Sequence, residues 1–205
     1  ALLRRTVAPM GVEPKTAVLH RIGWSQNPQC RLIGQDGSEE TVGLDVLDSL
    51  TGEAKKTKSL REILIELPDS FLEQVELWDT PGFGSLSLSH EISARKALSD
   101  ADLALWVTPI DAAITKAEME KLERLKGYDT PVVLIVNKAD LADDEEERAE
   151  AVDDIADTVG DRVVKVLWTS CKVALEAMGD QDKGRPEASG FGHLEEEILE
   201  RVLQW

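Results

Sequence analysis

The sequence predicts an α/β fold over residues 1–205, as one domain with a doubly wound, mostly parallel sheet, an antiparallel edge strand and helices on both faces. Three short runs, at residues 103–109, 131–140 and 162–170, are almost wholly apolar and rich in β-branched residues. Such runs are typical of parallel strands that are buried on both faces. Segments with helical periodicity separate them, and this alternation of strand and helix indicates the doubly wound class.

The remaining elements follow from local patterns. Helices are predicted at residues 114–127, 143–160 and 193–204. Upstream, residues 61–69 and 73–80 are separated by a short turn that contains Pro68, which predicts an antiparallel pair. Residues 16–24 are another predicted strand. The polar, turn-rich region 25–59 is expected to be a surface loop with a short helix near 42–49.

The composition excludes several classes of function. The chain has 23 Lys and Arg against 40 Asp and Glu, a net charge of −17. Nucleic-acid phosphates and anionic lipid headgroups both require a basic surface, so we expect no nucleic-acid partner and no direct electrostatic docking to a membrane. The acidity indicates a self-repelling, solvated surface or, alternatively, an acidic face for a partner. The two distant cysteines, Cys30 and Cys171, have no secretory signal before them and favour a reducing, cytoplasmic compartment.

A tight turn at residues 79–82 follows the strand predicted at 73–80 and reads Asp-Thr-Pro-Gly. A carboxylate at the carboxyl end of a buried strand can hold Mg²⁺, and a Gly with a free backbone N–H can donate to a terminal phosphate. Asp79 is therefore a candidate metal ligand and Gly82 a candidate phosphate donor. The pattern is short, and any strand that ends in such a turn would match it.

The second motif, Asn137-Lys138-Ala139-Asp140, ends the apolar run 131–140 and is more specific. Asp140 can accept both the ring N–H and the exocyclic amino group of guanine, two donors that adenine does not present together. The stem of Lys138 can lie along the base, while Asn137 joins neighbouring loops. A site built to pair those two donors discriminates strongly, because the wrong base leaves a buried carboxylate unpaired.

The third motif, Thr169-Ser170-Cys171-Lys172, ends the next predicted strand. A backbone N–H, predicted to be that of Cys171, would donate here to the carbonyl oxygen of guanine. Ser170, Cys171 and Lys172 therefore join the predicted nucleotide site. A nucleophilic or redox role for Cys171 is disfavoured, because no His lies near it in the sequence.

These three motifs in this order resemble the nucleotide-binding core of a translation-factor-type GTPase, and residues 2–24 and 61–83 narrow the resemblance to dynamin-like GTPases. The resemblance implies a P-loop-GTPase-like fold that binds GTP or GDP with Mg²⁺ and hydrolyses GTP. Thr16 stands where those proteins place their Mg²⁺-binding threonine, which implies Thr16 and Asp79 as metal ligands and Thr16 and Gly82 as catalytic groups. The resemblance also implies self-association through the GTPase domain, and membrane remodelling through regions outside this chain, by a cytoplasmic protein peripheral to a membrane.

The chain departs from that pattern because no G-x-x-x-x-G-K-[ST] sequence occurs in it. That loop supplies the backbone amides and the lysine that bind phosphate, so we expect these residues alone to bind GTP weakly and to show little or no hydrolysis. An N-terminal truncation, with the first strand and the loop absent, is the simplest explanation. Two alternatives stay open: a non-catalytic nucleotide-binding or assembly module, and a ribosome-assembly GTPase, whose usual basic RNA-binding region is missing here.

Overall fold

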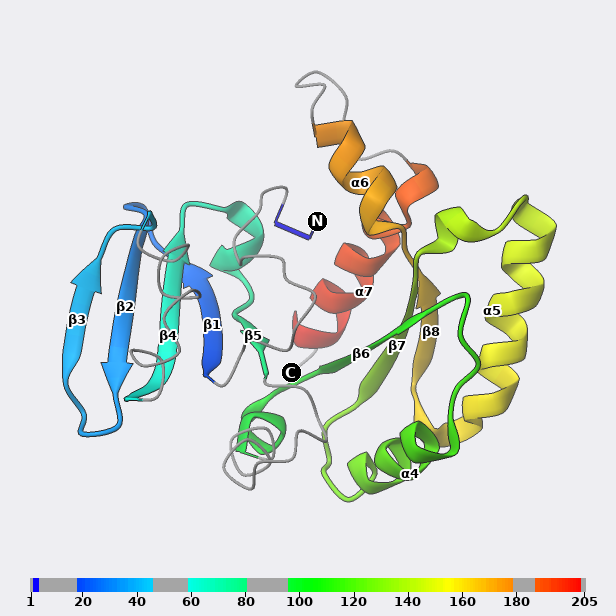
Figure 1. Ribbon diagram of the computed structural model, residues 1–205, viewed down its shortest axis with the longest axis horizontal. Coiled ribbons are helices and arrows are strands. Elements are labelled where there is room, and N and C mark those ends of the chain that lie inside the picture. The colour runs from blue at the N-terminus through cyan, green and yellow to red at the C-terminus, as the bar shows by residue number, and fades with distance from the viewer. Residues whose placement is uncertain (1, 4–17, 46–58, 81–95, 179–186, 204–205) are drawn as a thin grey trace. The chain divides into compact units, whose positions relative to one another are not determined.

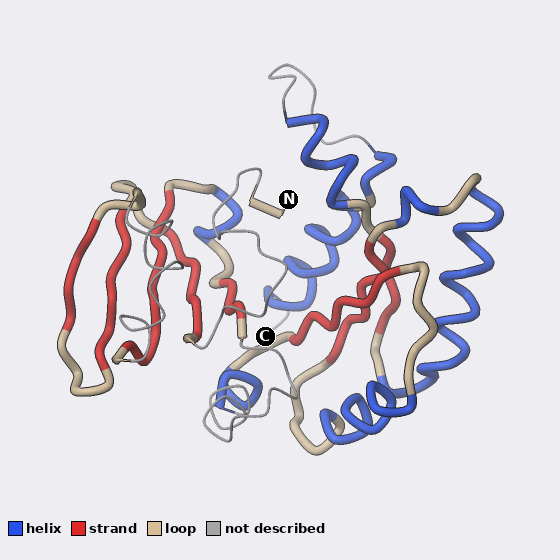
Figure 2. The backbone as a smooth tube through the Cα atoms, viewed as in Figure 1, coloured by secondary structure: helices blue, strands red, loops and turns tan. Residues whose placement is uncertain are grey.

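The computed structural model describes residues 2–3, 18–45, 59–80, 96–178 and 187–203. The chain divides into two compact units, unit 1 with residues 1–5 and 98–205, and unit 2 with residues 6–97 (Figure 1). Within the described residues, unit 2 consists mainly of strands, whereas unit 1 alternates strands and helices (Figure 2). The α/β class expected from the sequence is confirmed. No helix in the described part of the chain is both long and apolar enough to cross a bilayer.

Unit 2 contains a five-stranded mixed sheet with the strand order β3-β2-β4-β1-β5. Only β1 and β4 pair in parallel, and the other three pairs are antiparallel. The expected mostly parallel sheet therefore does not describe this unit. Its elements are β1 (Leu19–Trp24), β2 (Gln29–Gly34), β3 (Glu39–Val42), β4 (Leu60–Leu67), the 3-10 helix η1 (Ser70–Glu73) and β5 (Leu77–Asp79).

The antiparallel pair predicted for residues 61–69 and 73–80 is wrong. These segments form β4 and β5, but β1 lies between them and pairs with both. The connection is no tight turn, because it contains η1, whose first turn is capped by the Asp69 side chain as it accepts from the N–H of Phe71. Phe71 and Leu72 are buried, so this connection packs into the core instead of reversing directly into the next strand.

The surface loop predicted for residues 25–59 is also wrong in its first half, which forms the antiparallel pair of β2 and β3. Cys30 and Leu32 alternate with polar residues and are buried, a period of two that fits a strand with one buried face. Gly37, with φ of 83°, and Asp36, which accepts from the N–H of Ser38 at 3.0 Å, shape the turn between the strands. Most of the short helix expected near 42–49 lies outside the described residues, and Val42 ends β3.

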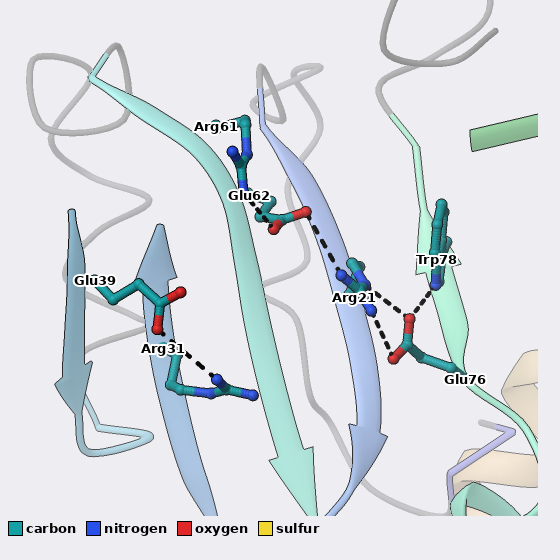
Figure 3. Close-up of polar contacts among 7 residues, drawn as sticks. All are labelled: Arg21, Arg31, Glu39, Arg61, Glu62, Glu76 and Trp78. Carbon is teal, nitrogen blue, oxygen red and sulfur yellow. Dashed lines mark hydrogen bonds and ion pairs between the residues drawn. The ribbon is translucent and has the colours of Figure 1, made fainter. Parts of the chain in front are cut away.

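The two faces of the unit 2 sheet differ in polarity. One face carries buried apolar side chains such as Ile65 and Cys30, both fully buried. The opposite face carries cross-strand ion pairs (Figure 3). Arg21 of β1 contacts Glu76 through Nε at 2.7 Å and through Nη2 at 3.0 Å, and its guanidinium lies 5.0 Å from the centre of the Trp78 ring. This contact holds the short strand β5 beside β1.

Unit 1 contains a three-stranded parallel sheet with the order β6-β7-β8. In Figure 1, α5 and α7 lie on opposite sides of this sheet, as expected for a doubly wound arrangement. Val133, Leu134 and Val136 of the central strand are fully buried. The elements are β6 (Ala104–Pro109), α4 (Lys116–Leu125), β7 (Val132–Asn137), η2 (Ala139–Leu141), α5 (Glu145–Val159), η3 (Gly160–Arg162), β8 (Lys165–Trp168), α6 (Cys171–Met178), η4 (Glu187–Ser189) and α7 (Phe191–Leu203).

The predicted elements of unit 1 are confirmed with small shifts of their ends. The apolar runs became β6, β7 and β8, and the three predicted helices became α4, α5 and α7. Thr115 and Glu118 form a capping box at the start of α4, and Asp144 caps α5 by accepting from the N–H of Glu147 at 2.9 Å. The short helix α6, which begins at Cys171 within the third motif, was not predicted from the sequence.

Candidate functional site

The polar residues of the second and third motifs meet at one edge of the unit 1 sheet. Asn137 is the last residue of β7, and Thr169 and Ser170 directly follow β8. Because β7 and β8 are parallel neighbours, their carboxyl ends lie at the same edge. Ligands of open α/β sheets bind outside the carboxyl ends of the strands, so this edge is the natural place for a site in unit 1.

Asn137 joins the two loops, as expected from the sequence. Its Oδ1 accepts hydrogen bonds from Thr169 Oγ1 at 3.3 Å and from the backbone N–H of Cys171 at 3.2 Å. The N–H of Ala139 donates to the Thr169 carbonyl at 3.1 Å. These contacts hold residues 137–140 against residues 169–171 in a defined arrangement. The Cys171 N–H predicted to face guanine is thus bonded to Asn137 in this structure.

The Asp140 carboxylate is held from two sides. Its Oδ1 accepts from the Ser170 hydroxyl, and its Oδ2 lies 3.9 Å from Lys172 Nζ. The Asp140 side chain is only 15% exposed, whereas that of Lys172 is 68% exposed. A carboxylate oriented in this way, with little contact with water, can accept two parallel N–H donors from a planar ligand. The structure thus brings Ser170, Lys172 and Asp140 together at this edge.

Ser170 also begins the helix that the sequence did not predict. Its hydroxyl accepts from the N–H of Val173 at 3.1 Å, and its carbonyl accepts from the N–H of Ala174 at 3.1 Å. One hydroxyl therefore donates to Asp140 and caps the first turn of α6 at the same time. The position of the carboxylate is coupled to the start of this helix.

Lys138 has an unusual backbone conformation, with φ of 62° and ψ of 33°. It is the one residue other than Gly with positive φ in the part of the chain that the structure describes. Its Nζ lies 3.8 Å from Oδ1 of Asp111, in the turn after β6. Left-handed backbone at a lysine is disfavoured and is retained where the surroundings require it, which is frequent at binding sites.

Two residues that support the site were missed in the sequence. The N–H of Ser170 donates to the carbonyl of Ser189 at 2.9 Å, and both side chains are buried. Gly190 follows with φ of 69°, and a Cβ there would lie 2.2 Å from the carbonyl oxygen of Trp168. A Ser-Gly pair before a helical pattern indicates a turn. The Ser-Gly pair does not, however, indicate which strand this turn contacts.

Asp79 lies in unit 2, as the last residue of β5, directly opposite His20 of β1. His20 is 6% exposed, and its Nδ1 has no hydrogen-bond partner. Burial lowers the pKa of His20, while the Asp79 charge and the Val18 backbone oppose this shift. Asp79 is an exposed residue, but its carboxylate loses part of its hydration. This loss raises the pKa of Asp79, and the charge of His20 opposes the shift.

The chemistry of Asp79 fits a Mg²⁺ ligand. A carboxylate that has lost hydration favours a cation beside it, and Mg²⁺ keeps several waters while it binds one or two protein oxygens. The described residues contain no group of three or more His, Cys, Asp and Glu that could hold a metal ion by themselves. Thr16 and Gly82, predicted as catalytic groups, lie outside the described residues.

Comparison with known proteins places the chain in a class and then in a family. A stretch of 72 residues, 33% of this chain and 24% of the relative, is 39% identical to GTPase Era of Caldanaerobacter subterraneus subsp. tengcongensis. The chain belongs to the GTPase superfamily. Residues 1–140 match the model of the dynamin family, and the chain belongs to that family.

Longer relatives agree with this assignment. An uncharacterised protein in the xynA 3′ region of Caldicellulosiruptor sp. (strain Rt8B.4) is 26% identical over 205 residues, covering 96% of this chain and 51% of that protein. Dynamin-like protein 2 of Campylobacter jejuni subsp. jejuni is 25% identical over 194 residues, covering 94% of this chain and 30% of that protein. The chain thus spans about half or less of the length of these two relatives.

A solved structure shares the fold. It is that of an oligomerised bacterial dynamin pair described as a mechanism for the long-range sensing and tethering of membranes. The TM-score is 0.75 at 15% sequence identity, and the match covers 97% of this chain and 35% of that one. At this identity the likeness concerns the fold alone.

Proposed function

We propose that this chain binds GTP and GDP and hydrolyses GTP as part of a dynamin-like protein. The observation that carries the proposal is the Asp140 carboxylate, which is held by Ser170 at the edge where Asn137 joins the two loops. An oriented carboxylate that is only 15% exposed suits the two adjacent N–H donors of guanine. The membership in the dynamin family supports the same ligand.

In this proposal Asn137, Lys138, Asp140, Ser170, Cys171 and Lys172 serve the guanine base. Asp79 and Thr16 hold Mg²⁺, and Gly82 donates its N–H to the γ-phosphate. Bound Mg²⁺ would neutralise charge on the phosphates during transfer. The raised pKa of Asp79, caused by lost hydration, supports its role as a ligand, since a cation beside it would compensate for the lost water.

We further propose that nucleotide binding promotes self-association and that the whole protein acts from the cytoplasm at a membrane surface. The structural neighbour is an oligomerised pair described as tethering membranes, which motivates both statements. The net charge of −17 argues that contact with anionic lipid occurs through regions other than this chain. Light scattering of the protein with GDP and with a non-hydrolysable GTP analogue tests the self-association. An unchanged mass in both states would contradict it.

Replacement of Asp140 by Asn tests the base assignment. An amide at this position can present its NH2 group, which cannot accept from the N–H donors of guanine but donates to the carbonyl oxygen that xanthine has in place of the guanine amino group. The affinity for GDP should fall by 10²-fold or more, on the order of the penalty for unpaired buried polar groups, while that for XDP should rise. Asp129→Asn is the control, because it removes the same negative charge at an exposed position of unit 1. Unchanged GDP affinity in Asp140→Asn, measured with fluorescent nucleotides, would refute the assignment.

A further inference from the structure

Asp111 lies beside the candidate base site without a role in the function proposed above. It occupies the turn after β6, and its side chain is 52% exposed. Its Oδ1 lies 3.8 Å from the ammonium of Lys138, which is 55% exposed. An ion pair at this exposure contributes little to the free energy of folding. We therefore ask how it affects the position of the Lys138 side chain.

The backbone sets the position of Asp111 relative to Lys138. β6 and β7 pair in parallel up to Pro109 and Asn137, and the N–H of Ile110 donates to the Asn137 carbonyl at 2.8 Å. The N–H of Ala112 then donates to the Pro109 carbonyl at 3.3 Å and closes a turn around Asp111. The residue before Asp111 is thus bonded to the residue before Lys138. Such placement does not depend on the ion pair itself.

The charges at this edge are divided into two separate pairs. Lys138 pairs with Asp111 at 3.8 Å, and Lys172 pairs with Asp140 at 3.9 Å. Without Asp111, the ammonium of Lys138 would lose its partner in the turn after β6 and would be free to approach Asp140, two residues further along the chain. A lysine that neutralises Asp140 competes with the N–H donors of a base.

We propose that Asp111 is a positioning residue for guanine binding, which holds the ammonium of Lys138 at the end of β6 and away from Asp140. The Lys138 stem is then ordered before a base arrives, and its ordering costs less at the moment of binding. The left-handed backbone of Lys138 is consistent with a side chain that is aimed in one direction by its surroundings. This inference rests on the proposed function.

Asp111→Asn tests it, in the protein as its gene encodes it, with GDP carrying a fluorescent label as the probe. At about 50 mM salt, the dissociation constant should rise about two- to fivefold, the effect of one exposed ion pair. At about 1 M salt, where the screening length is about 3 Å, the difference should disappear. Asp129→Asn should leave the affinity unchanged at both salt concentrations. Asp111→Glu should recover part of the loss, because it restores the charge.

A double-mutant cycle separates this role from a merely structural one. In a Lys138→Met background, Asp111→Asn should have no further effect on GDP affinity. A full Asp111→Asn effect in that background would mean that Asp111 acts through another group and would overturn the inference. Equal affinity of Asp111→Asn and the unchanged protein at low salt would overturn it as well. If the unchanged protein binds no guanine nucleotide, the proposed function fails and the inference fails with it.

Discussion

Substitution of Gly190 by Ala should destabilise unit 1 by about 2–5 kcal/mol. A residue with a Cβ pays about 1–2 kcal/mol for left-handed backbone, and Gly190 has φ of 69°. The new Cβ would lie 2.2 Å from the Trp168 carbonyl oxygen, whereas real Cβ contacts are not closer than 3.0 Å. The obstacle is backbone, so either β8 or α7 must move. Overpacking of this kind typically costs about 1–3 kcal/mol.

The same substitution should weaken GDP binding. Trp168 immediately precedes the loop that contacts Asn137, and Ser189, the neighbour of Gly190, accepts from the N–H of Ser170 at 2.9 Å. A displacement that breaks one of these hydrogen bonds loses about 1 kcal/mol, which is about a fivefold increase in the dissociation constant. Stability and affinity should therefore fall together.

Urea unfolding with hydrogen exchange at the amides of β7 and β8 measures the stability of unit 1 by itself. Gly192→Ala, in the helix α7 that follows Gly190, is the control. Outside the helix's own backbone nothing lies within 4 Å of its new Cβ, and it should stabilise α7 by up to about 1 kcal/mol. Gly37→Ala, with φ of 83° and open space in unit 2, measures the backbone cost alone. A loss in Gly190→Ala no larger than that in Gly37→Ala would show that the contact with Trp168 is not rigid and would refute the reasoning.

Two further predictions concern unit 2 and the thiols. Burial lowers the pKa of His20 below its unfolded value, so the unfolded chain binds its proton first and the stability of unit 2 should fall as the pH falls through about 6.5. His20→Gln should show a shallower fall between about pH 7 and 5, and equal slopes would contradict this. Burial also raises the pKa of Cys30 to about 11, so Ellman's reagent should modify Cys171 readily and Cys30 only after unfolding. A Cys171→Ser variant that still reacts quickly when folded would contradict this assignment.

The strands and the three longer helices of unit 1 could be predicted from the sequence, because the patterns that indicate them are local. The strands are short apolar runs, and the helices begin at recognisable caps such as Thr115 and Asp144. Parallel neighbours in chain order then follow from the alternation of strand and helix.

The strand order of unit 2 could not be predicted in the same way, because several strands that are neighbours in the sheet lie far apart in the sequence. β1 pairs with β4 and β5, both much later in the chain, so adjacent sequence did not indicate adjacent strands. Arg21 and Glu76 lie in segments that were predicted as strands, residues 16–24 and 73–80, but no local pattern indicated that these two segments would lie side by side. Alternation was visible in β2, where Cys30 and Leu32 point to the core, but Gly and Asp residues around it indicated a loop.

The residues of the candidate site also differ in whether a local pattern predicts them. Asn137, Lys138 and Asp140 could be predicted because one short motif carries the chemistry and its position after an apolar run gives its place on the sheet. Asp111 and Gly190 could not, because each contacts the site through strand register or through a turn that packs against a distant strand. A sequence motif therefore predicts which side chains contact a ligand. The residues that hold those side chains in place lie at the ends of neighbouring strands and can be identified only from the structure. For this reason variants at Asp111 and Gly190 test the site more sharply than further changes within the motifs.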